Sequence, residues 1–178
     1  MKTLNSLLLT IALFFSLNSF GQEEESEGFK HHSISVLLSH SVVFEGVENG
    51  SKKAISLPSW ALNYNYSFNE KWAIGLHNDI IIENFNIEKT KDSEVIERST
   101  PIASLLVGTY KITKGMGIEL GGGMEFEKNE NFVLARIGAE YGIEIPKLNL
   151  EVLIGFDYDI IFDAYNSINL GVGIAKRF

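Results

Sequence analysis

Hydrophobic and polar residues alternate along most of this chain after residue 31, with the two-residue period of a β-strand. In the final segment, for example, Leu170, Val172 and Ile174 alternate with glycine and alanine. The pattern predicts eight strands, near residues 32–44, 54–68, 71–85, 101–111, 117–126, 132–145, 148–159 and 166–178. Most of these segments are longer than the five or six residues usual in soluble sheets, and no helical period competes with them.

The connections between these segments alternate in length, which fits an antiparallel up-and-down order. Short turns are expected at residues 69–70, 112–116 and 146–147. Longer polar loops are expected at 45–53, 86–100 and 160–165, whereas the fourth connection of this set, 127–131, is short. All the short turns would then lie at one end of the sheet and the other connections at the opposite end.

The two faces of the predicted strands differ in a way that favours a membrane barrel over a soluble sandwich. One face carries bulky apolar side chains, as in Trp60, Leu62 and Tyr64, and the other face is polar. The polar face also holds many glycines, namely Gly75, Gly121, Gly123, Gly138, Gly142, Gly155, Gly171 and Gly173. A narrow barrel interior explains them, because small residues make room there for large ones. The sequence therefore predicts an all-β fold, an eight-stranded antiparallel up-and-down transmembrane β-barrel.

Two residues fit the apolar face badly, and one strand has no clear facing. Strict alternation puts His40 and Asn78 on the apolar face, and we expect a β-bulge near Leu37 to turn His40 inward. The fourth strand, 101–111, has apolar residues on both faces, so alternation does not say which face is inside.

The beginning of the chain has the features of an exported protein. Residues 1–21 combine a lysine, an apolar run too short to span a bilayer and small residues before the expected cut, as in a signal peptide. Residues 22–31 are expected to form a periplasmic acidic lead-in, and residues 32–178 the barrel domain. The sequence contains no cysteine, so neither disulfides nor lipoprotein processing is expected.

The acidic balance of the chain limits its partners. Without the signal segment, 14 Lys and Arg stand against 23 Asp and Glu. This balance disfavours nucleic acid, which requires a basic surface. No residue pattern indicates a cofactor or a metal site.

Aromatic residues gather near the predicted strand ends, where the rings of membrane barrels meet the lipid headgroups. The set expected at the end with the short turns is Phe68, Trp72, Tyr110, Tyr141 and Phe178.

Taken together, the signal segment, the eight strands, the alternating connections, the aromatic ends and the terminal Phe178 resemble the small outer-membrane β-barrel proteins of the OmpA/OmpX type. The resemblance covers the whole predicted barrel. It implies the outer membrane of a Gram-negative bacterium, with both termini in the periplasm. It also implies contact with outer-membrane lipid, a monomeric state and recognition of the last strand by the barrel assembly machinery.

The predicted inner face carries charges that must pair or reach water. We expect two groups: Arg136 with Glu125, Glu140 and Asp157, and Arg177 with Glu119, Glu144 and Glu151. The main interpretation is a salt-bridged plug that fills the lumen of a protein with a structural role, or with a role in presenting its loops, chiefly 86–100, to a partner.

Two other functions stay open at this level. A narrow cation-preferring pore would explain the excess of acids on the inner face. A lipid-modifying enzyme would need a base and its orienting carboxylate, and His77 and Asp79 share a face two residues apart. No serine is placed beside them, so the sequence predicts a protein that is not an enzyme.

Overall fold

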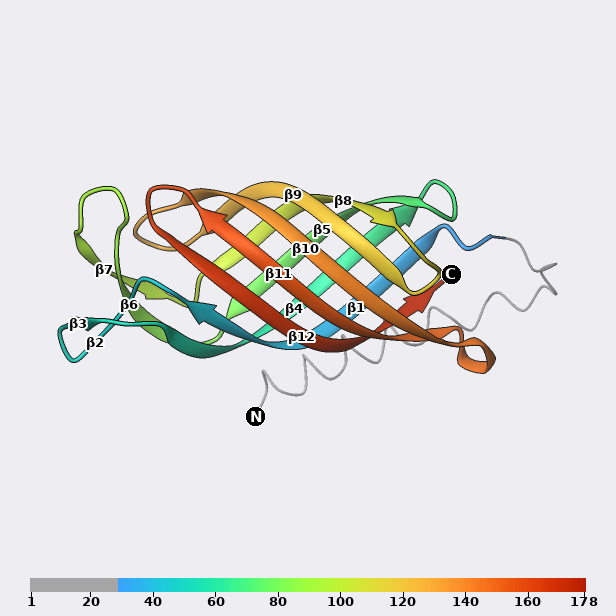
Figure 1. The fold of residues 1–178 in the computed structure, drawn as a ribbon, viewed down its shortest axis with the longest axis horizontal. Helices are drawn as coiled ribbons and strands as arrows, with labels where there is room; N and C mark the ends of the chain where they lie inside the picture. The colour runs from blue at the N-terminus through green and yellow to red at the C-terminus, as the bar shows by residue number, and fades with distance from the viewer. Residues whose placement is uncertain (1–28) are drawn as a thin grey trace, which may run out of the picture.

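A closed β-barrel forms the body of the protein, as the side view in Figure 1 shows. The computed structural model describes residues 29–178; the predicted signal segment, 1–21, and residues 22–28 of the lead-in lie outside the described residues. The barrel strands are β1 (His32–Val43), β4 (Ile55–Ser67), β5 (Trp72–Ile81), β8 (Ile102–Lys111), β9 (Met116–Phe126), β10 (Phe132–Ile145), β11 (Leu150–Ile161) and β12 (Tyr165–Arg177). The prediction of eight strands is confirmed.

Each barrel strand pairs antiparallel with its two neighbours, in the order β1-β12-β11-β10-β9-β8-β5-β4. The first strand closes the barrel, because β1 pairs with β4 on one side and with β12 on the other. No barrel strand is left with a free edge, so every one has hydrogen-bonding partners on both sides.

The two ends of the barrel differ. At one end the chain enters and leaves side by side, and the amide of His32 donates a hydrogen bond of 3.1 Å to the carbonyl of Phe178. The short turns at 68–71, 112–115 and 146–149 lie at this end, which we call the termini end; the last includes the 3-10 helix η2 (Pro146–Leu148). The opposite end is the cap end, where the connections 44–54 and 82–101 are long. The longer loop expected there at 160–165 is wrong, because β11 and β12 extend into it and leave a short turn at 162–164.

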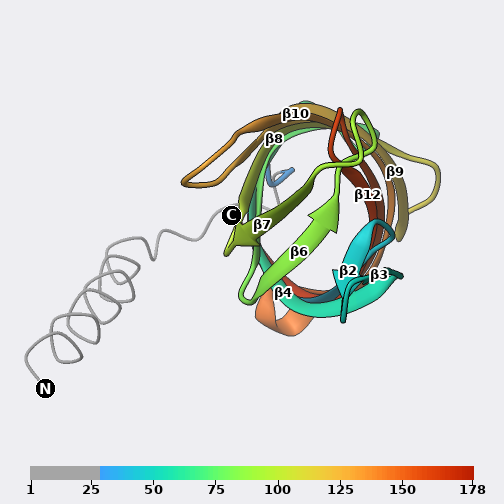
Figure 2. The same cartoon turned by 90° about the vertical axis from the view of Figure 1, so that its left-hand side faces the viewer.

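A second, small sheet covers the cap end, where the sequence predicted loops. It has the order β3-β2-β6-β7 and lies across the barrel mouth in the end-on view of Figure 2. Its strands are β2 (Gly46–Glu48), β3 (Ser51–Lys52), β6 (Asn84–Glu88) and β7 (Val95–Ser99). The predicted end of the third strand, 71–85, is therefore wrong. β5 ends at Ile81, and the residues from Asn84 onward join this cap sheet.

Burial shows which side chains point into the barrel. In β8, Leu105 and Val107 are buried inside, so this strand contributes apolar residues to the lumen. His40 lies on the outer face and is exposed, and the expected bulge near Leu37 is wrong. The reason is the register: β1 pairs residue for residue with both neighbours, which leaves no extra residue to reverse the alternation.

Two apolar clusters lie inside the barrel. The larger one lies toward the cap end, where Phe85 and Ile87 of β6 pack on barrel residues such as Leu105 and Leu134. The smaller cluster comprises Leu37, Ala61, Leu153 and Ala175. Within residues 29–178, no helix has the length and apolar character needed to cross a bilayer.

Candidate functional site

The lumen is the candidate site, and the inward residues of strand β10 show how its character changes from one end of the barrel to the other. From the cap end to the termini end, the inward residues of β10 include Phe132, Leu134, Arg136, Glu140 and Glu144. An apolar section near the cap is thus followed by a buried cation and then by carboxylates. Because strand side chains alternate, all of these side chains share one face of the strand.

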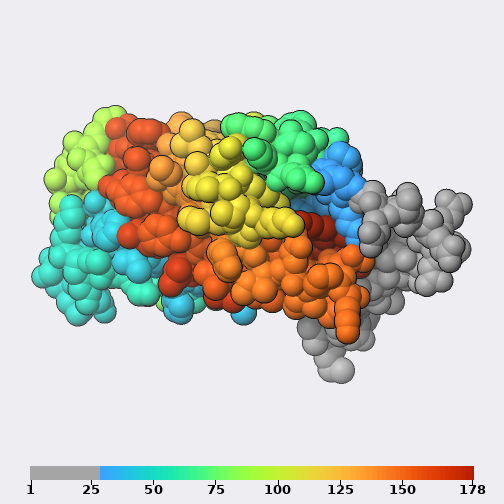
Figure 3. All heavy atoms as spheres, turned by 45° about the vertical axis from the view of Figure 1, so that its right-hand side comes forward, coloured from blue at the N-terminus to red at the C-terminus, as the bar shows by residue number. Residues whose placement is uncertain are grey.

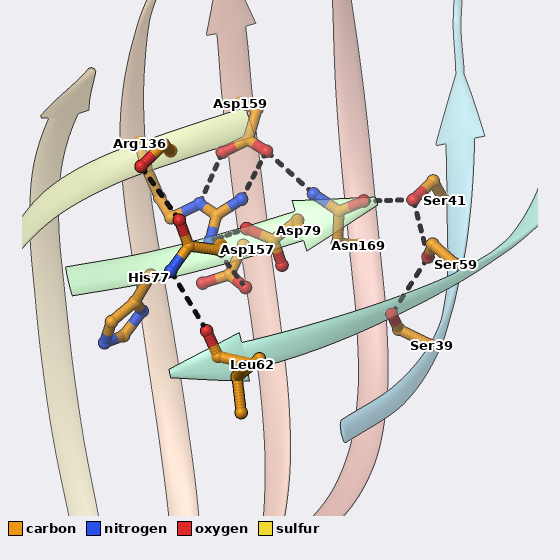
Figure 4. Close-up of polar contacts among 12 residues, drawn as sticks. Ser39, Ser41, Ser59, Leu62, His77, Asp79, Arg136, Asp157, Asp159 and Asn169 are labelled. Atoms are coloured by element: carbon orange, nitrogen blue, oxygen red, sulfur yellow. Dashed lines mark hydrogen bonds and ion pairs between the residues drawn. The ribbon is translucent and has the colours of Figure 1, made fainter. Parts of the chain in front are cut away.

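Arg136 is the centre of the middle section and is 2% exposed. Its Nε and one terminal nitrogen each lie 2.7 Å from an oxygen of Asp159, as a two-pronged ion pair. The other terminal nitrogen lies 2.8 Å from Asp79 and 3.8 Å from Asp157 (Figure 4). Asp79 belongs to β5, three strands away round the wall, so this one side chain bridges the lumen.

A line of polar side chains continues from Asp159 to the first strands. The amide of Asn169 donates a 2.8 Å hydrogen bond to Asp159, and the amide oxygen accepts one from Ser41. The Ser41 hydroxyl lies 2.8 Å from that of Ser59, which lies 2.9 Å from that of Ser39 (Figure 4). The line joins β11, β12, β1 and β4. Its hydrogen bonds therefore link β1, the strand that closes the barrel, to the strands on both of its sides.

Two of the partners expected for Arg136 lie elsewhere. Glu140 is four residues away on the same strand, about 13 Å along it. Glu125 pairs in register with Phe132, which is four residues from Arg136 in the other direction. The register partner of Arg136 on β11 is Asp159, and this pairing brings the two charges together.

At the termini end, Arg177 holds two carboxylates. Its terminal nitrogens lie 2.9 Å from Glu144 and 2.6 Å from Glu151. Glu119, also expected near Arg177, instead accepts a 3.3 Å hydrogen bond from Thr109. A cavity of about 50 Å³ opens here, and both Glu119 and Glu140 line it.

Two lumen glycines make room for carboxylates. A Cβ atom on Gly138 would collide with Asp157, and one on Gly142 would collide with the carboxylate of Glu151. At these two positions glycine gives the carboxylates their room inside a narrow barrel, as the sequence pattern indicated.

Near the cap end, Arg98 of β7 reaches into the barrel mouth and is fully buried. Its terminal nitrogens lie 2.6 Å from Glu125 and 2.7 Å from the carbonyl of Glu130, and the guanidinium lies 4.8 Å from the Phe132 ring centre. Tyr165 donates a hydrogen bond to the second oxygen of Glu125. This group, the Arg98 latch, ties the cap sheet to the barrel wall, and sequence reasoning missed it because Arg98 lies in a predicted loop.

The pair considered for an enzyme is not assembled. His77 is buried, and its Nε2 lies 3.0 Å from the amide oxygen of Asn65, whereas Asp79 contacts Arg136. Among residues 29–178, no group of three or more His, Asp or Glu side chains has a geometry suited to a metal ion.

The five expected girdle aromatics all lie near the termini end of their strands, and four of them are exposed by half or more: Phe68, Trp72, Tyr141 and Phe178. Tyr110 is half-buried, with its ring centre 4.7 Å from that of Trp72. Outward Asn78 is explained by its neighbours: it accepts a hydrogen bond of 2.9 Å from Ser104 and donates one of 3.3 Å to the carbonyl of Leu62.

No protein-family model and no curated protein matches this sequence. Solved structures do match. Neisserial surface protein A aligns with a TM-score of 0.55 at 11% identity, covering 85% of this chain and all of that chain. OprG from Pseudomonas aeruginosa aligns with a TM-score of 0.55 at 12% identity, covering 86% of this chain and 99% of that chain. The attachment invasion locus protein Ail of Yersinia pestis, in complex with the heparin analogue sucrose octasulfate, aligns with a TM-score of 0.54 at 18% identity, covering 84% of this chain and all of that chain.

Proposed function

The fold is that of the small eight-stranded outer-membrane β-barrel proteins, and from this premise we propose an integral outer-membrane protein with a closed, polar lumen. The termini end faces the periplasm, and the cap sheet lies outside the cell. The protein acts as a monomer, either as a structural element of the membrane or by presenting the cap sheet to a partner at the surface.

The observation that carries this proposal is the outer belt of the barrel. Outward Leu38, Leu120 and Leu106 are 75, 70 and 60% exposed, and similar side chains surround the whole wall. A soluble monomer rarely exposes more than a few hundred Å² of continuous apolar surface. Lipid is the environment that such a belt requires, and a closed barrel can enter lipid because its backbone groups are paired.

The contents of the lumen support a closed barrel over a pore. The Arg136 cluster bridges the middle section, and the apolar cluster around Leu105 and Leu134 fills the section toward the cap. The cap sheet and the Arg98 latch cover the mouth above them. An eight-stranded barrel has an interior just wide enough for such side chains.

The cap sheet supports a surface role. It carries charged residues, such as Lys52, which lies 3.6 Å from Glu88. In the turn between β6 and β7, Lys91 lies 3.3 Å from Asp163 of the β11–β12 turn. Lys89 lies 2.7 Å from Glu94, and this hydrogen bond raises the pKa of Lys89. An ordered, charged sheet above the headgroups is a surface for proteins or glycolipids rather than for nucleic acid, since acids predominate over bases in the sequence.

Cell fractionation and gel migration test the proposal. We expect the protein in the outer-membrane fraction, and an unheated sample in detergent to migrate differently from a boiled one because the barrel resists unfolding. A protein that stays soluble and monodisperse without detergent would overturn the proposal.

Two further measurements separate the possible roles. Planar-bilayer recording should show no steady conductance, whereas a cation-selective current would establish a pore. A deletion strain should keep an unchanged membrane-lipid composition, because no catalytic pair is assembled in the lumen; altered acyl chains would favour an enzyme.

A further inference from the structure

The outer wall has an apolar groove near the termini end. The groove has a volume of about 530 Å³ and is lined by Trp72 of β5, Gly108 and Tyr110 of β8, Ile118, Glu119 and Leu120 of β9, and Ile137 and Gly138 of β10. Glu119 and Gly138 occupy inward positions of their strands, and the other six are outward. The groove lies on the outward face, so the lumen contents do not fill it.

Gly108 creates the groove. Its neighbours on the same face across the strands are Ile74 and Leu120, and both have large side chains. A Cβ atom on Gly108 would meet nothing nearer than the carbonyl oxygen of Leu120 at 3.8 Å. The backbone thus leaves space for a side chain that the sequence does not supply, and the outward side chains around this space are apolar or aromatic, as an acyl chain requires.

The charges beside the groove indicate the kind of lipid. The turn 112–115 joins the two strands that carry Gly108 and Leu120, and it contains Lys114. The turn before β5 contains Lys71, whose carbonyl accepts a 2.8 Å hydrogen bond from the amide of Lys111 in β8. Both lysines are exposed, and among the described residues neither side chain forms an ion pair, although Glu70 is adjacent in sequence to Lys71. Figure 3 shows the yellow β8–β9 hairpin beside the green β4–β5 turn near this end of the barrel.

The other charges at the termini end are of both signs: Glu70 is exposed in the same turn as Lys71, and the sequence that precedes β1 is acidic. Lys147 and Lys176 are exposed there as well, whereas Glu144 is engaged by Arg177. Lys71 and Lys114 are the cations next to the groove, and among the described residues they form no ion pair. Cations next to an apolar wall attract lipids with anionic headgroups.

We propose that this groove is a binding site for one anionic phospholipid of the inner leaflet. One acyl chain lies over Gly108, between Ile74 and Leu120, and the phosphate group lies at the level of Trp72 and Tyr110, within reach of Lys71 and Lys114. This site rests on the proposed orientation, in which the termini end faces the periplasm.

Trp72 makes the site measurable. The chain has two tryptophans, Trp60 and Trp72, and brominated acyl chains quench tryptophan fluorescence on contact. The Trp60→Phe variant reports on the groove, and the Trp72→Phe variant reports, through Trp60 on β4, on the wall away from the groove. Each variant is reconstituted in phosphatidylcholine vesicles that contain brominated phosphatidylglycerol or brominated phosphatidylcholine with the same acyl chains.

We expect brominated phosphatidylglycerol to quench Trp72 at lower mole fractions than brominated phosphatidylcholine. At low ionic strength, we expect each lysine to lower the mole fraction of brominated phosphatidylglycerol needed for a given quenching about fivefold relative to brominated phosphatidylcholine. This difference should fall as salt is added. Trp60 should show no such preference. The double variant Lys71→Gln and Lys114→Gln should remove the preference at Trp72, whereas the matched pair Lys147→Gln and Lys176→Gln should retain most of it.

The groove itself is tested by filling it. Gly108→Leu should weaken quenching of Trp72 by both lipids. Gly122→Leu is the matched control: Gly122 is also outward, lies outside the groove, and a Cβ there would likewise meet only a carbonyl oxygen at 3.8 Å. This control should behave as the parent protein does.

The outcomes separate the site from the proposed function. If neither lipid quenches either tryptophan, the protein is not embedded in the bilayer, and the outer-membrane proposal is wrong. If both lipids quench Trp72 equally, or if Gly108→Leu and Gly122→Leu act alike, the barrel is embedded but the specific lipid site is wrong.

Discussion

At the scale of single residues, the barrel depends on glycines where two strands approach closely. A Cβ atom on Gly173 would lie 2.7 Å from the Cα of Leu37 and would also collide with the carbonyl of Val36, both on the neighbouring strand β1. Gly155 faces the same Leu37 side chain, but a Cβ there would be 3.5 Å from it, an ordinary contact. Gly173 is therefore required by the close approach of the two backbones, whereas the site of Gly155 has room for a methyl group.

We therefore predict that Gly173→Ala lowers the free energy of unfolding by about 1–3 kcal/mol, because backbone atoms of the seam between β1 and β12 must move apart. Gly155→Ala should change it by no more than about 0.5 kcal/mol. Urea unfolding in detergent, followed by gel migration, measures both. Equal effects would show that the seam adapts to a methyl group.

Arg136 is the second residue whose removal should be costly. Arg136→Ala leaves Asp79, Asp157 and Asp159 without their shared cation in a buried site, and we predict a loss of about 3–5 kcal/mol in the same unfolding measurement. Arg177→Ala is the control: Arg177 and its partner Glu144 are partly exposed, although Glu151 is buried, so we predict a smaller loss than for Arg136→Ala. A similar loss for both variants would contradict a special role for the central cluster.

At the scale of elements, alternation in the sequence was enough for the eight strands but not for the cap sheet. The facing of β8 could not be read because Leu105 and Val107 point into an apolar part of the lumen. The hairpin of β2 and β3 did carry a signal: Asn49 and Gly50 have φ of 54° and 74°, as the two central residues of a type I′ turn require, and Asn-Gly is the preferred pair there. β6 and β7 are short and charged, so only their packing on the barrel mouth explains them.

The Arg98 latch leads to a prediction for these elements. Arg98→Ala removes the ion pair with Glu125 and the hydrogen bond to the Glu130 carbonyl, so β6 and β7 should exchange amide hydrogens faster and be cleaved sooner by added protease. The barrel strands should keep their protection. Lys91→Ala, which removes an exposed pair with Asp163, is the control and should leave the cap sheet unchanged. Unaltered exchange in Arg98→Ala would mean that Phe85 and Ile87 hold the cap without the latch.

At the scale of the whole molecule, the partners of the lumen charges depend on the stagger between strands. Alternation alone puts Arg136 and the acids on the inner face. It does not say that Asp159 is level with Arg136 or that Glu125 is level with Phe132, because that needs the register of every strand pair round the barrel. Nor does it show that Asp79 on the opposite wall comes within 2.8 Å of Arg136. The sequence therefore limits which residues meet inside but not which pairs form.

The closed state of the barrel should depend on two barriers in series: the cap sheet together with the apolar cluster that its Phe85, Ile87 and Ile96 complete, and the Arg136 cluster. In one variant, residues 84–99 are replaced by a short glycine-serine turn; the barrel can accept this because Ile80 and Ile102 are register partners on adjacent strands. We predict that this variant stays non-conducting in planar bilayers, because Arg136 still bridges the lumen, and that Arg136→Ala alone stays non-conducting under the cap. The two changes together should give a small cation-selective current, because Asp79, Asp157 and Asp159 remain in the opened section. Arg177→Ala in the shortened protein is the control and should not conduct. A current through either single variant would mean that the barrel has one barrier, and an anion-selective current in the combined variant would mean that the acids do not line the opened path.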